Sequence, residues 1–439
     1  MLEAQALKFK EIILMRLTIL TQYYAPEIGA PQIRLRSLAK ELRRHGIEVD
    51  VLTAMPNYPA GKIFPAYTRA WKRKEYIDGI PVRRTWIYAG TGKSAFIRLA
   101  NYLSFTMTAL FAALFGPRSD VIFVESQPLS LGLVALLMKW LRRVPYIYNV
   151  PDLQIDVAKQ LGFIRNTAFL RLAQGLENFF LRHAWKLSTV TQRFITHYQN
   201  RGLSRDKITF LPNGADTEFL KPLPPCQELL DRWKLENKKV FLYVGTHAYY
   251  HCLDTLIETA TLLRNRLDII FLMVGDGPER ARLKKVVAER GLPNVIFGQS
   301  PYEEMDRLYS IAYASIATLC RMKVARDMRL SKIFPSLSCA VPVIYSGEGE
   351  AADLLTKHNC GIAVSPESPK ELKNAIIDLA GDPVKREKMG HSGRKFVESE
   401  YSWSIIVDRW LQEIGYIESH HAPDDRKIEF QAQTRQVPF

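Results

Sequence analysis

The chain has 439 residues, about twice what a single hydrophobic core usually supports. Its 47% apolar and 24% charged residues exclude a disordered or fibrous protein. Lys and Arg number 60 against 45 Asp and Glu, a net charge of +15 at pH 7, which leaves nucleic acid, an anionic membrane surface and phosphorylated substrates open as partners.

The positive charge is concentrated in the first half of the chain. Residues 15–205 hold 27 basic and 11 acidic side chains, whereas residues 206–439 hold 31 and 32. One domain is therefore expected to be strongly cationic and the other close to neutral.

The five cysteines are odd in number and scattered along the sequence. This distribution predicts neither a disulfide framework nor a zinc site, and it fits a reducing cytosol. Residues 1–14 lack the order of a secretory signal, and we expect them to be a dispensable extension before a start at Met15.

Strands and helices alternate in both halves, which predicts an α/β fold. In the first half an amphipathic helix is expected at 33–44, and apolar runs predict strands at 17–22, 49–53, 121–124, 146–150 and 187–191. In the second half the expected helices are 253–264 and 278–290, and the expected strands are 240–244, 269–274, 294–297, 314–318 and 341–345. Such βαβ units form doubly wound parallel sheets.

The expected domain boundaries follow from this alternation. We assign 15–205 to a first Rossmann-like domain and 206–402 to a second, with a proline-rich linker at 220–226 and a flexible tail at 420–439. The carboxyl ends of the two sheets would then face one ligand across a central cleft.

Residues 99–117 form a run of nineteen uncharged residues between two arginines, long enough to span a bilayer. Polar side chains dilute its first half, and a Gly-Pro pair ends it. This intermediate hydrophobicity favours a helix that is buried in the domain, or lies partly in a bilayer interface, over a transmembrane span.

Several glycines follow predicted strands, where a ligand can approach the backbone. Gly29 ends the loop 23–30 before the first helix, although a plain strand-to-helix turn explains it equally well. Gly245 and Thr246 follow the first strand of the second half, and Gly277 follows the next one. Taken alone, the Gly-x-Gly match around Gly277 favours a simple turn.

Two histidines and a basic run occupy the same region. His247 and His251 stand in a predicted loop without helical phase, so an imidazole near a diphosphate fits better than a metal pair. Five basic residues lie within 321–332, either on a solvated helix face or where they would neutralise a leaving diphosphate. They are Arg321, Lys323, Arg326, Arg329 and Lys332.

Three carboxylates follow strands. Glu348 and Glu350 precede a helix, where they can cap it or accept hydrogen bonds from sugar hydroxyls. Asp152 follows the strand 146–150 and is a candidate for orienting an acceptor or accepting its proton. A helix N-cap explains Asp152 at least as well.

Together these motifs resemble those of family 4 glycosyltransferases of the GT-B fold, particularly the fucosyl- and N-acetylfucosaminyl-transferase-like members of bacterial polysaccharide assembly. The resemblance covers about residues 16–415. It rests on the segments 23–30, 56–61, 78–84, 211–219, 274–279, 293–298, 331–334 and 347–350. In such enzymes the first domain binds the acceptor, the second binds a nucleotide-sugar, and a last helix, here 403–417, returns to the first domain.

The chain departs from the family pattern at positions that would face the donor. Thr246 and His251 stand where family members carry an Arg and a Lys that face the donor diphosphate. Asp327 and Pro335 take the places of the paired glutamates, and Ala340 stands at a small-glycine position. Lys332 and the arginines near it are the expected compensators.

The resemblance implies transfer of a glycosyl group from a nucleoside diphosphate sugar, with retention at the anomeric carbon and without a metal or other cofactor. The expected catalytic residues are Asp152 and Lys332. The expected donor-binding residues are Gly29, Gly245, Thr246, His251, Gly277, Gly298, Arg329, Lys332, Glu348 and Glu350.

The cationic first domain would then receive a polyprenyl-diphosphate-linked acceptor at the inner face of the plasma membrane, and the protein would be cytoplasmic and attached to the anionic surface by charge. Two alternatives remain open: a sugar-nucleotide epimerase, and a catalytically degenerate partner protein. A nucleic-acid partner is not expected, because the chain carries no aromatic-basic motif of the known modules.

Overall fold

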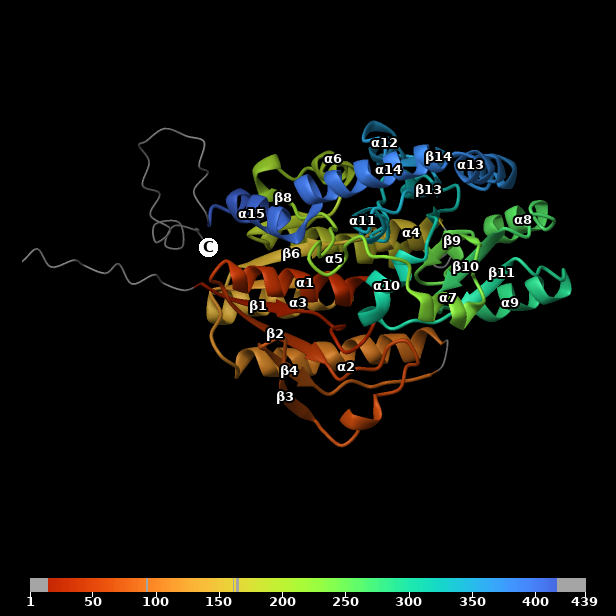
Figure 1. Ribbon diagram of the computed structural model, residues 1–439. Helices are drawn as coiled ribbons and strands as arrows, with labels where there is room; N and C mark the ends of the chain where they lie inside the picture. The colour runs from red at the N-terminus through yellow and green to blue at the C-terminus, as the bar shows by residue number, and fades with distance from the viewer. Residues whose placement is uncertain (1–14, 92–93, 161, 163–165, 417–439) are drawn as a thin grey trace, which may run out of the picture.

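The computed structural model describes residues 15–91, 94–160, 162 and 166–416 (Figure 1). The predicted extension 1–14 and tail 420–439 lie outside the described residues. Within these ranges the chain builds two α/β units, each around its own sheet, which confirms the predicted GT-B arrangement of two Rossmann-like domains.

The first sheet contains eight strands. They are β1 (Arg16–Leu20), β2 (Glu48–Ala54), β3 (Lys72–Ile77), β4 (Ile80–Thr85), β5 (Val121–Glu125), β6 (Tyr146–Val150), β7 (Lys186–Thr189) and β8 (Ile208–Phe210). Their order is β3-β4-β2-β1-β5-β6-β7-β8, and only the β3–β4 pair is antiparallel. The helices of this unit are α1 (Ala30–Arg44), α2 (Ala95–Leu114), α3 (Leu131–Arg142), α4 (Gln154–Gln160), α5 (Thr167–His183) and α6 (Gln192–Asn200).

The second sheet contains six parallel strands. They are β9 (Lys239–Val244), β10 (Ile269–Val274), β11 (Val295–Gly298), β12 (Ala314–Thr318), β13 (Val343–Ser346) and β14 (Gly361–Val364), in the order β11-β10-β9-β12-β13-β14. The helices of this unit are α7 (Gln227–Trp233), α8 (Asp254–Leu262), α9 (Arg280–Glu289), α10 (Met305–Ser310), α11 (Ile333–Ser338), α12 (Glu350–Lys357), α13 (Pro369–Gly381) and α14 (Pro383–Phe396), and the chain ends its described part with α15 (Trp403–Glu413).

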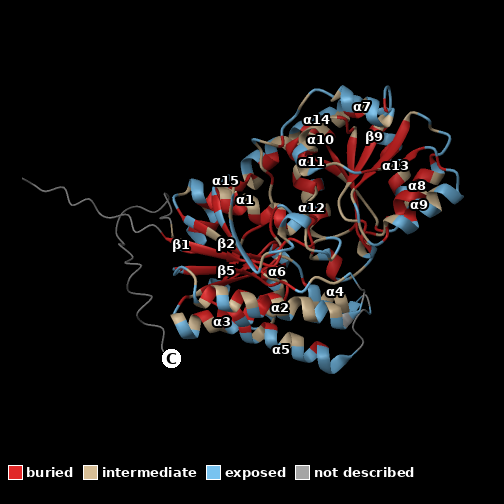
Figure 2. Cartoon of the chain, turned by 90° about the horizontal axis from the view of Figure 1, so that it is seen from below, coloured by how far each residue is buried: buried red, intermediate tan, exposed pale blue. Residues whose placement is uncertain are grey.

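Apolar layers cover both faces of the first sheet. On one face lie α2, α3 and α5, whose buried side chains include Phe105, Val134 and Phe180. On the other face α1 and α15 bury residues such as Leu38 and Trp410. Figure 2 shows these two groups of helices on opposite sides of the sheet. The last helix α15 thus packs with the first domain, far from its neighbours in sequence.

The boundary predicted between residues 205 and 206 is wrong. Strand β8 pairs with β7 and completes the first sheet, so this domain continues past residue 210. The strand has only three residues, too few for an apolar pattern to identify it. The chain passes to the second domain through 211–226, where Ala215 also pairs with Ser402 before α15.

The backbone is strained at Ala340. Ala340 stands at the small-glycine position and adopts φ 55°, a left-handed conformation that favours glycine. We expect Ala340→Gly to raise the free energy of unfolding by about 1 kcal/mol, since relief of the Cβ clash outweighs the added chain entropy. Urea unfolding would measure this, and a variant less stable than wild type would contradict it.

Candidate functional site

The carboxyl end of β9 holds a buried lysine against a glycine. Gly245 directly follows β9 with φ 141°, and a Cβ atom there would lie 2.9 Å from the Nζ atom of Lys332. The Lys332 ammonium also stands 4.0 Å from the centre of the Tyr243 ring. The missing side chain at Gly245 therefore leaves the space that Lys332 needs beside the backbone.

The Lys332 ammonium is buried and has no hydrogen-bond partner among the described residues. Burial lowers its pKa to about 7, because an ammonium loses hydration there without gaining a counter-charge. An isolated buried cation is costly, so its side chain is well placed to receive an anion. This is the strongest electrostatic feature at the carboxyl edge of the second sheet.

Two neutral histidines lie beside this lysine. Burial, together with nearby positive charge, lowers the pKa of His247 to about 4, and burial lowers that of His251 well below its ordinary value. The Nδ1 atom of His251 lies 3.2 Å from the carbonyl oxygen of Thr318, whereas both ring nitrogens of His247 are buried and have no hydrogen-bond partner within the part of the chain that the structure describes. Both imidazoles therefore offer neutral hydrogen-bonding groups near neutral pH.

Gly277 holds the neighbouring loop against His247. It adopts φ 154°, and a Cβ atom there would come within 2.6–2.8 Å of the His247 backbone. The His247 amide donates to the carbonyl of Asp276 at 2.8 Å, and its carbonyl accepts from the amide of Glu279 at 3.0 Å. The glycine thus allows two loops at the strand ends to pack backbone to backbone, which is a structural reason for the motif.

Two loops of the first domain reach this edge. The buried carboxylate of Glu27 accepts from the amides of Asn57 and Tyr58 at 2.7 and 2.8 Å and from that of Tyr24 at 3.2 Å. Burial nevertheless raises its pKa to about 7. Glu27 thereby ties the loop 23–30 to the Asn-Tyr-Pro segment.

Tyr58 connects these two loops to the second domain. Its ring packs edge-on against Tyr23, with ring centres 5.7 Å apart. Its hydroxyl is within hydrogen-bonding reach of the Thr246 side chain. The two domains therefore meet beside the Gly245–Lys332 pair.

Asp152 lies on the first-domain side, in the segment between β6 and α4. The residue as a whole is exposed, but desolvation of its carboxyl by the surrounding protein raises its pKa to about 6, against the opposing effects of a hydrogen bond from Gln127 and the charge of Arg34. It also influences Tyr250 of the second domain through its charge. The predicted acceptor-side carboxylate is thus close to both domains.

A buried polar network lies beneath Asp152. Asn149 donates to Glu125 at 2.8 Å, and Arg34 donates to Asn149 at 3.1 Å. Burial raises the pKa of Glu125 to about 7. Among the described residues, several buried polar atoms on Gln22, Arg34, Glu125 and Gln127 have no hydrogen-bond partner, although Arg34 and Glu125 form an ion pair at 3.7 Å. Such unpaired atoms beside the interdomain contact can serve a hydroxyl-rich ligand.

Arg329 and Glu350 join the two domains. The Arg329 side chain donates to the carbonyl of Val190 at 2.7 Å and forms an ion pair with Glu350 at 3.3 Å. The Glu350 carboxylate also accepts from the amides of Gln192 and Arg193, at the start of α6. Both carboxylate oxygens of Glu350 are thus already bonded. Its predicted contact with a sugar stays a prediction, because a sugar hydroxyl would have to replace one of these partners.

The other predicted donor-site residues lie in various places. Glu348 pairs with Arg326 at the surface, at 2.7 Å. Gly29 is the N-cap of α1 in extended backbone (φ 179°), which any residue adopts. Gly298 is buried where a Cβ would meet Trp233, so packing accounts for it. Of the basic run, the structure brings only Lys332 to Gly245, and the arginines expected to compensate make other contacts.

A basic pocket of about 510 Å³ separates α4 from the segment after β12. The Gln160 side chain, which lines the pocket, accepts from the amide of Val324 at 3.2 Å. Its lining residues are Asp156, Lys159, Gln160, Arg321, Met322 and Lys323. Three cations against one carboxylate make this second interdomain feature suited to an anion.

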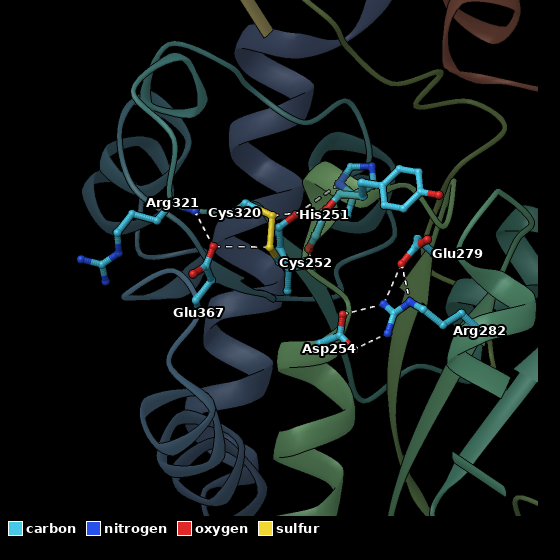
Figure 3. Close-up of a disulfide and its surroundings, with 10 residues drawn as sticks. His251, Cys252, Asp254, Glu279, Arg282, Cys320, Arg321 and Glu367 are labelled. Atoms are coloured by element: carbon cyan, nitrogen blue, oxygen red, sulfur yellow. Dashed lines mark hydrogen bonds and ion pairs between the residues drawn. A yellow bond between two sulfur atoms is a disulfide. The ribbon is translucent and has the colours of Figure 1, made fainter. Parts of the chain in front are cut away.

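A disulfide next to His251 overturns one prediction. Cys252 and Cys320 are bonded although 68 residues separate them (Figure 3). They meet because β9 and β12 are neighbours in the sheet and each cysteine follows one of these strands. Glu367 lies against the pair, 3.4 Å from the Cys252 sulfur, and accepts from the Arg321 amide at 2.9 Å. The scattered cysteine spacing is therefore no evidence for a reducing compartment.

The disulfide should make unfolding depend on reductant. Closing this loop stabilises the fold by roughly 4 kcal/mol in the loop-entropy model. We expect reductant to lower the urea midpoint of the wild type to that of a Cys252→Ser, Cys320→Ser double variant, and to leave the variant unchanged. Thiol titration of the denatured, unreduced chain should find only Cys226, Cys339 and Cys360. Five free thiols would contradict the bridge.

The two domains match two models of one enzyme class. Residues 29–214 match the model of the glycosyl transferase 4-like domain, and residues 228–396 match that of glycosyl transferases group 1. The chain is a family 4 glycosyltransferase of the GT-B fold.

Two relatives of this glycosyltransferase carry names from polysaccharide and glycolipid biosynthesis. A protein named as a colanic acid biosynthesis glycosyl transferase, WcaI of Escherichia coli K12, is 26% identical over 65% of this chain and 71% of its own. A GDP-mannose-dependent monoacylated phosphatidylinositol monomannoside mannosyltransferase of Corynebacterium glutamicum is 24% identical over 51% and 60%. The enzyme is thus a hexosyltransferase, and proteins named for polysaccharide and glycolipid biosynthesis are among those it resembles.

Solved structures show the same fold. Sucrose-phosphate synthase from Thermosynechococcus elongatus superposes with a TM-score of 0.71 over 91% of this chain and 98% of its own, at 20% identity. HepE of Anabaena, solved with UDP and glucose, gives a TM-score of 0.69 over 92% and 100%, at 17% identity. Identity this low compares folds alone.

Sequence reasoning about this glycosyltransferase missed several residues of the site. Glu27 and Tyr58 stand inside two of the family-like segments, but their role needs the contact between the loops. The Arg34–Glu125 network needs the sheet order, because its members are far apart in the sequence. The sequence predicts Lys332 only as one of several basic residues that could compensate for Thr246 and His251, and its packing against Gly245 comes from the structure.

Proposed function

We propose that the enzyme transfers a sugar, with retention, from a nucleoside diphosphate sugar to a lipid-linked acceptor of polysaccharide assembly. The observation that carries this proposal is the buried, unpartnered Lys332 ammonium beside Gly245. Neighbouring proteins of the same fold were solved with UDP, which supports a nucleotide donor.

In this proposal the second domain holds the donor diphosphate. The ammonium of Lys332 would neutralise the charge that develops as the diphosphate leaves, at an atom fixed in advance by packing on Tyr243. Thr246 and neutral His251 would supply hydrogen bonds where the family has cations. The Lys332 ammonium would then supply the positive charge that the leaving diphosphate needs. We propose that no metal or other cofactor is required.

The first domain would hold the acceptor. Asp152 would act as the general base. Its pKa near 6 leaves the carboxylate ionised at neutral pH, so it can accept a proton from an attacking hydroxyl. The unpaired polar atoms beneath it would orient the acceptor sugar.

We propose a polyprenyl-diphosphate-linked acceptor, because the pocket between α4 and the segment after β12 presents Lys159, Arg321 and Lys323 to an anion. This places the enzyme at the cytoplasmic face of the plasma membrane as a peripheral protein. The disulfide would have to persist or form reversibly in that compartment.

A transfer assay tests the proposed function. Purified enzyme is given UDP-, GDP- and dTDP-sugars with polyprenyl-diphosphate sugars, and NMR reads the anomeric configuration of the product. An α-linked product from an α-linked donor is the expected result. An inverted product would overturn retention, and epimerised donor without transfer would support the epimerase alternative instead. Absence of turnover with every pair would favour the degenerate partner.

A further inference from the structure

The outer face of the first domain is apolar to an unusual degree. Large side chains on three helices face solvent at helical spacing, with a third or more of their surface exposed. On α2 they are Phe96, Leu99, Leu103, Met107 and Phe111, with Phe115 directly after the helix; on α3 Leu133, Trp140 and Leu141; on α5 Phe169, Leu172, Leu176 and Phe179. We call this set the apolar face. Exposed apolar side chains gathered on one face are typical of a surface that contacts a partner or a membrane.

The three stripes form one surface. Trp140 of α3 packs edge-on against Phe179 of α5, with ring centres 6.5 Å apart. α2 packs beside α3, where Arg142 donates to the carbonyl of Ala113 at 2.9 Å. Figure 2 shows α2, α3 and α5 together on the side of the sheet away from α1. The opposite stripe of each helix is buried in the core, so each helix is apolar on two sides.

The charges around this face have one sign. The three helices carry Arg98, Lys139, Arg142, Arg171 and Arg182, and a single acid. That acid, Glu177, is buried and paired with Arg201 at 2.7 Å, so it does not reach the surface. A second copy of the chain docked on this face would set cations against cations. An anionic bilayer offers an apolar interior to the apolar face and negative headgroups to the basic residues around it.

Helix α2 is long and apolar enough to cross a membrane, with 22% of the Phe96–Leu114 window buried. Its polar side chains nevertheless bind it to the domain. Asn101 donates to the carbonyl of Tyr88 and accepts from Gln22, both at 2.8 Å, and Thr108 donates to the carbonyl of Trp86 at 2.7 Å. A spanning α2 would break these bonds and uncover the sheet, so the helix lies along a surface.

We propose that the apolar face inserts into the interfacial layer of an anionic bilayer, with α2, α3 and α5 parallel to the membrane. This rests on the proposed function and deepens it, since attachment is apolar as well as electrostatic. Helix α4 packs against α5 and lines the basic pocket, so docking brings that pocket to the headgroup region. A lipid-linked diphosphate then reaches the pocket without leaving the membrane.

Vesicle flotation of the full chain tests the proposal. The probe is vesicles of phosphatidylcholine with about 30% phosphatidylglycerol. The face variant is Leu99→Gln, Leu103→Gln, Phe111→Gln, and the matched control is Leu262→Gln, Leu267→Gln, Val384→Gln, which changes exposed apolar residues of the second domain. We expect wild type and control to stay bound at about 1 M NaCl, where attraction between exposed charges is screened.

The face variant should lose binding at least about tenfold, because three side chains no longer enter the interface. Circular dichroism and the melting temperature of each variant report folding. Binding of the face variant equal to wild type would overturn the proposal. A wild-type dimer in light scattering that the face variant abolishes, without vesicle binding, would overturn it in favour of self-association. Donor binding by both variants is measured in parallel. If the face variant binds vesicles like wild type, the membrane proposal fails, while the donor-binding result still tests the transfer function.

Discussion

Replacing Lys332 with methionine is expected to lower kcat/KM by about 10²–10³-fold, because the substitution removes the buried charge that would stabilise the leaving diphosphate. Methionine keeps the length and packing of the side chain on Tyr243, so the fold should survive. Steady-state kinetics with the donor found in the transfer assay measures the effect. The matched control is Lys357→Met, which removes an exposed charge from the last turn of α12.

The pH dependence of the protein's stability is a second test of the buried Lys332 ammonium. Its pKa in the folded protein, about 7, is below the ordinary lysine value, so the unfolded chain binds more protons between those values. The ammonium therefore destabilises the fold fully below pH 7, and this penalty fades as the pH rises. The melting temperature of Lys332→Met should exceed that of wild type most at low pH, with the difference shrinking above pH 7.

Donor binding should follow the opposite trend. A bound diphosphate raises the lysine pKa, so binding takes up a proton and weakens as pH rises above 7. Calorimetry in buffers of different ionisation enthalpy would detect this uptake. Equal donor affinity at pH 6 and pH 9, together with unchanged turnover of Lys332→Met, would remove the lysine from the mechanism.

Replacing Asp152 with asparagine is expected to lower kcat by about 10²–10⁴-fold, the usual contribution of a general base. The wild-type rate should rise with pH through a midpoint near 6 as the carboxylate forms, and the variant should lack this rise. Donor affinity should not change, because Asp152 belongs to the acceptor side. An Asp231→Asn variant on the surface of α7 is the control.

An N-cap or packing role would give a different pattern for Asp152. Loss of thermal stability with an unchanged pH profile would show that the carboxylate supports α4 and takes no proton. A kcat within twofold of wild type would contradict the base assignment outright.

The sequence predicted the sheet interiors well. Predicted strands at 146–150 and 269–274 agree with β6 and β10 to the residue. Buried parallel strands are continuous apolar runs, which is why they are visible. The antiparallel pair β3–β4 was missed because it lies at the edge of the sheet, and its outer strand is mostly charged and exposed.

The site was predictable only in part. The departures from the family pattern predict Lys332 and the arginines near it as compensators, and of these the structure brings Lys332 to Gly245, while its role toward a donor stays a prediction. Arg329 and Glu350 have the residue types of a ligand site, but they join the two domains, a contact that no local pattern encodes. The Cys252–Cys320 bridge likewise depends on the order of β9 and β12 in the sheet.

The central claim is that the second domain binds a nucleoside diphosphate sugar at Lys332. Isothermal titration of wild type, Lys332→Met and Lys357→Met with UDP-, GDP- and dTDP-sugars tests it most directly. We predict that wild type and Lys357→Met bind one of these donors with equal affinity and one-to-one stoichiometry, and that Lys332→Met binds it at least about tenfold more weakly. Equal affinity in all three proteins, or no binding of any donor to wild type, would contradict the account.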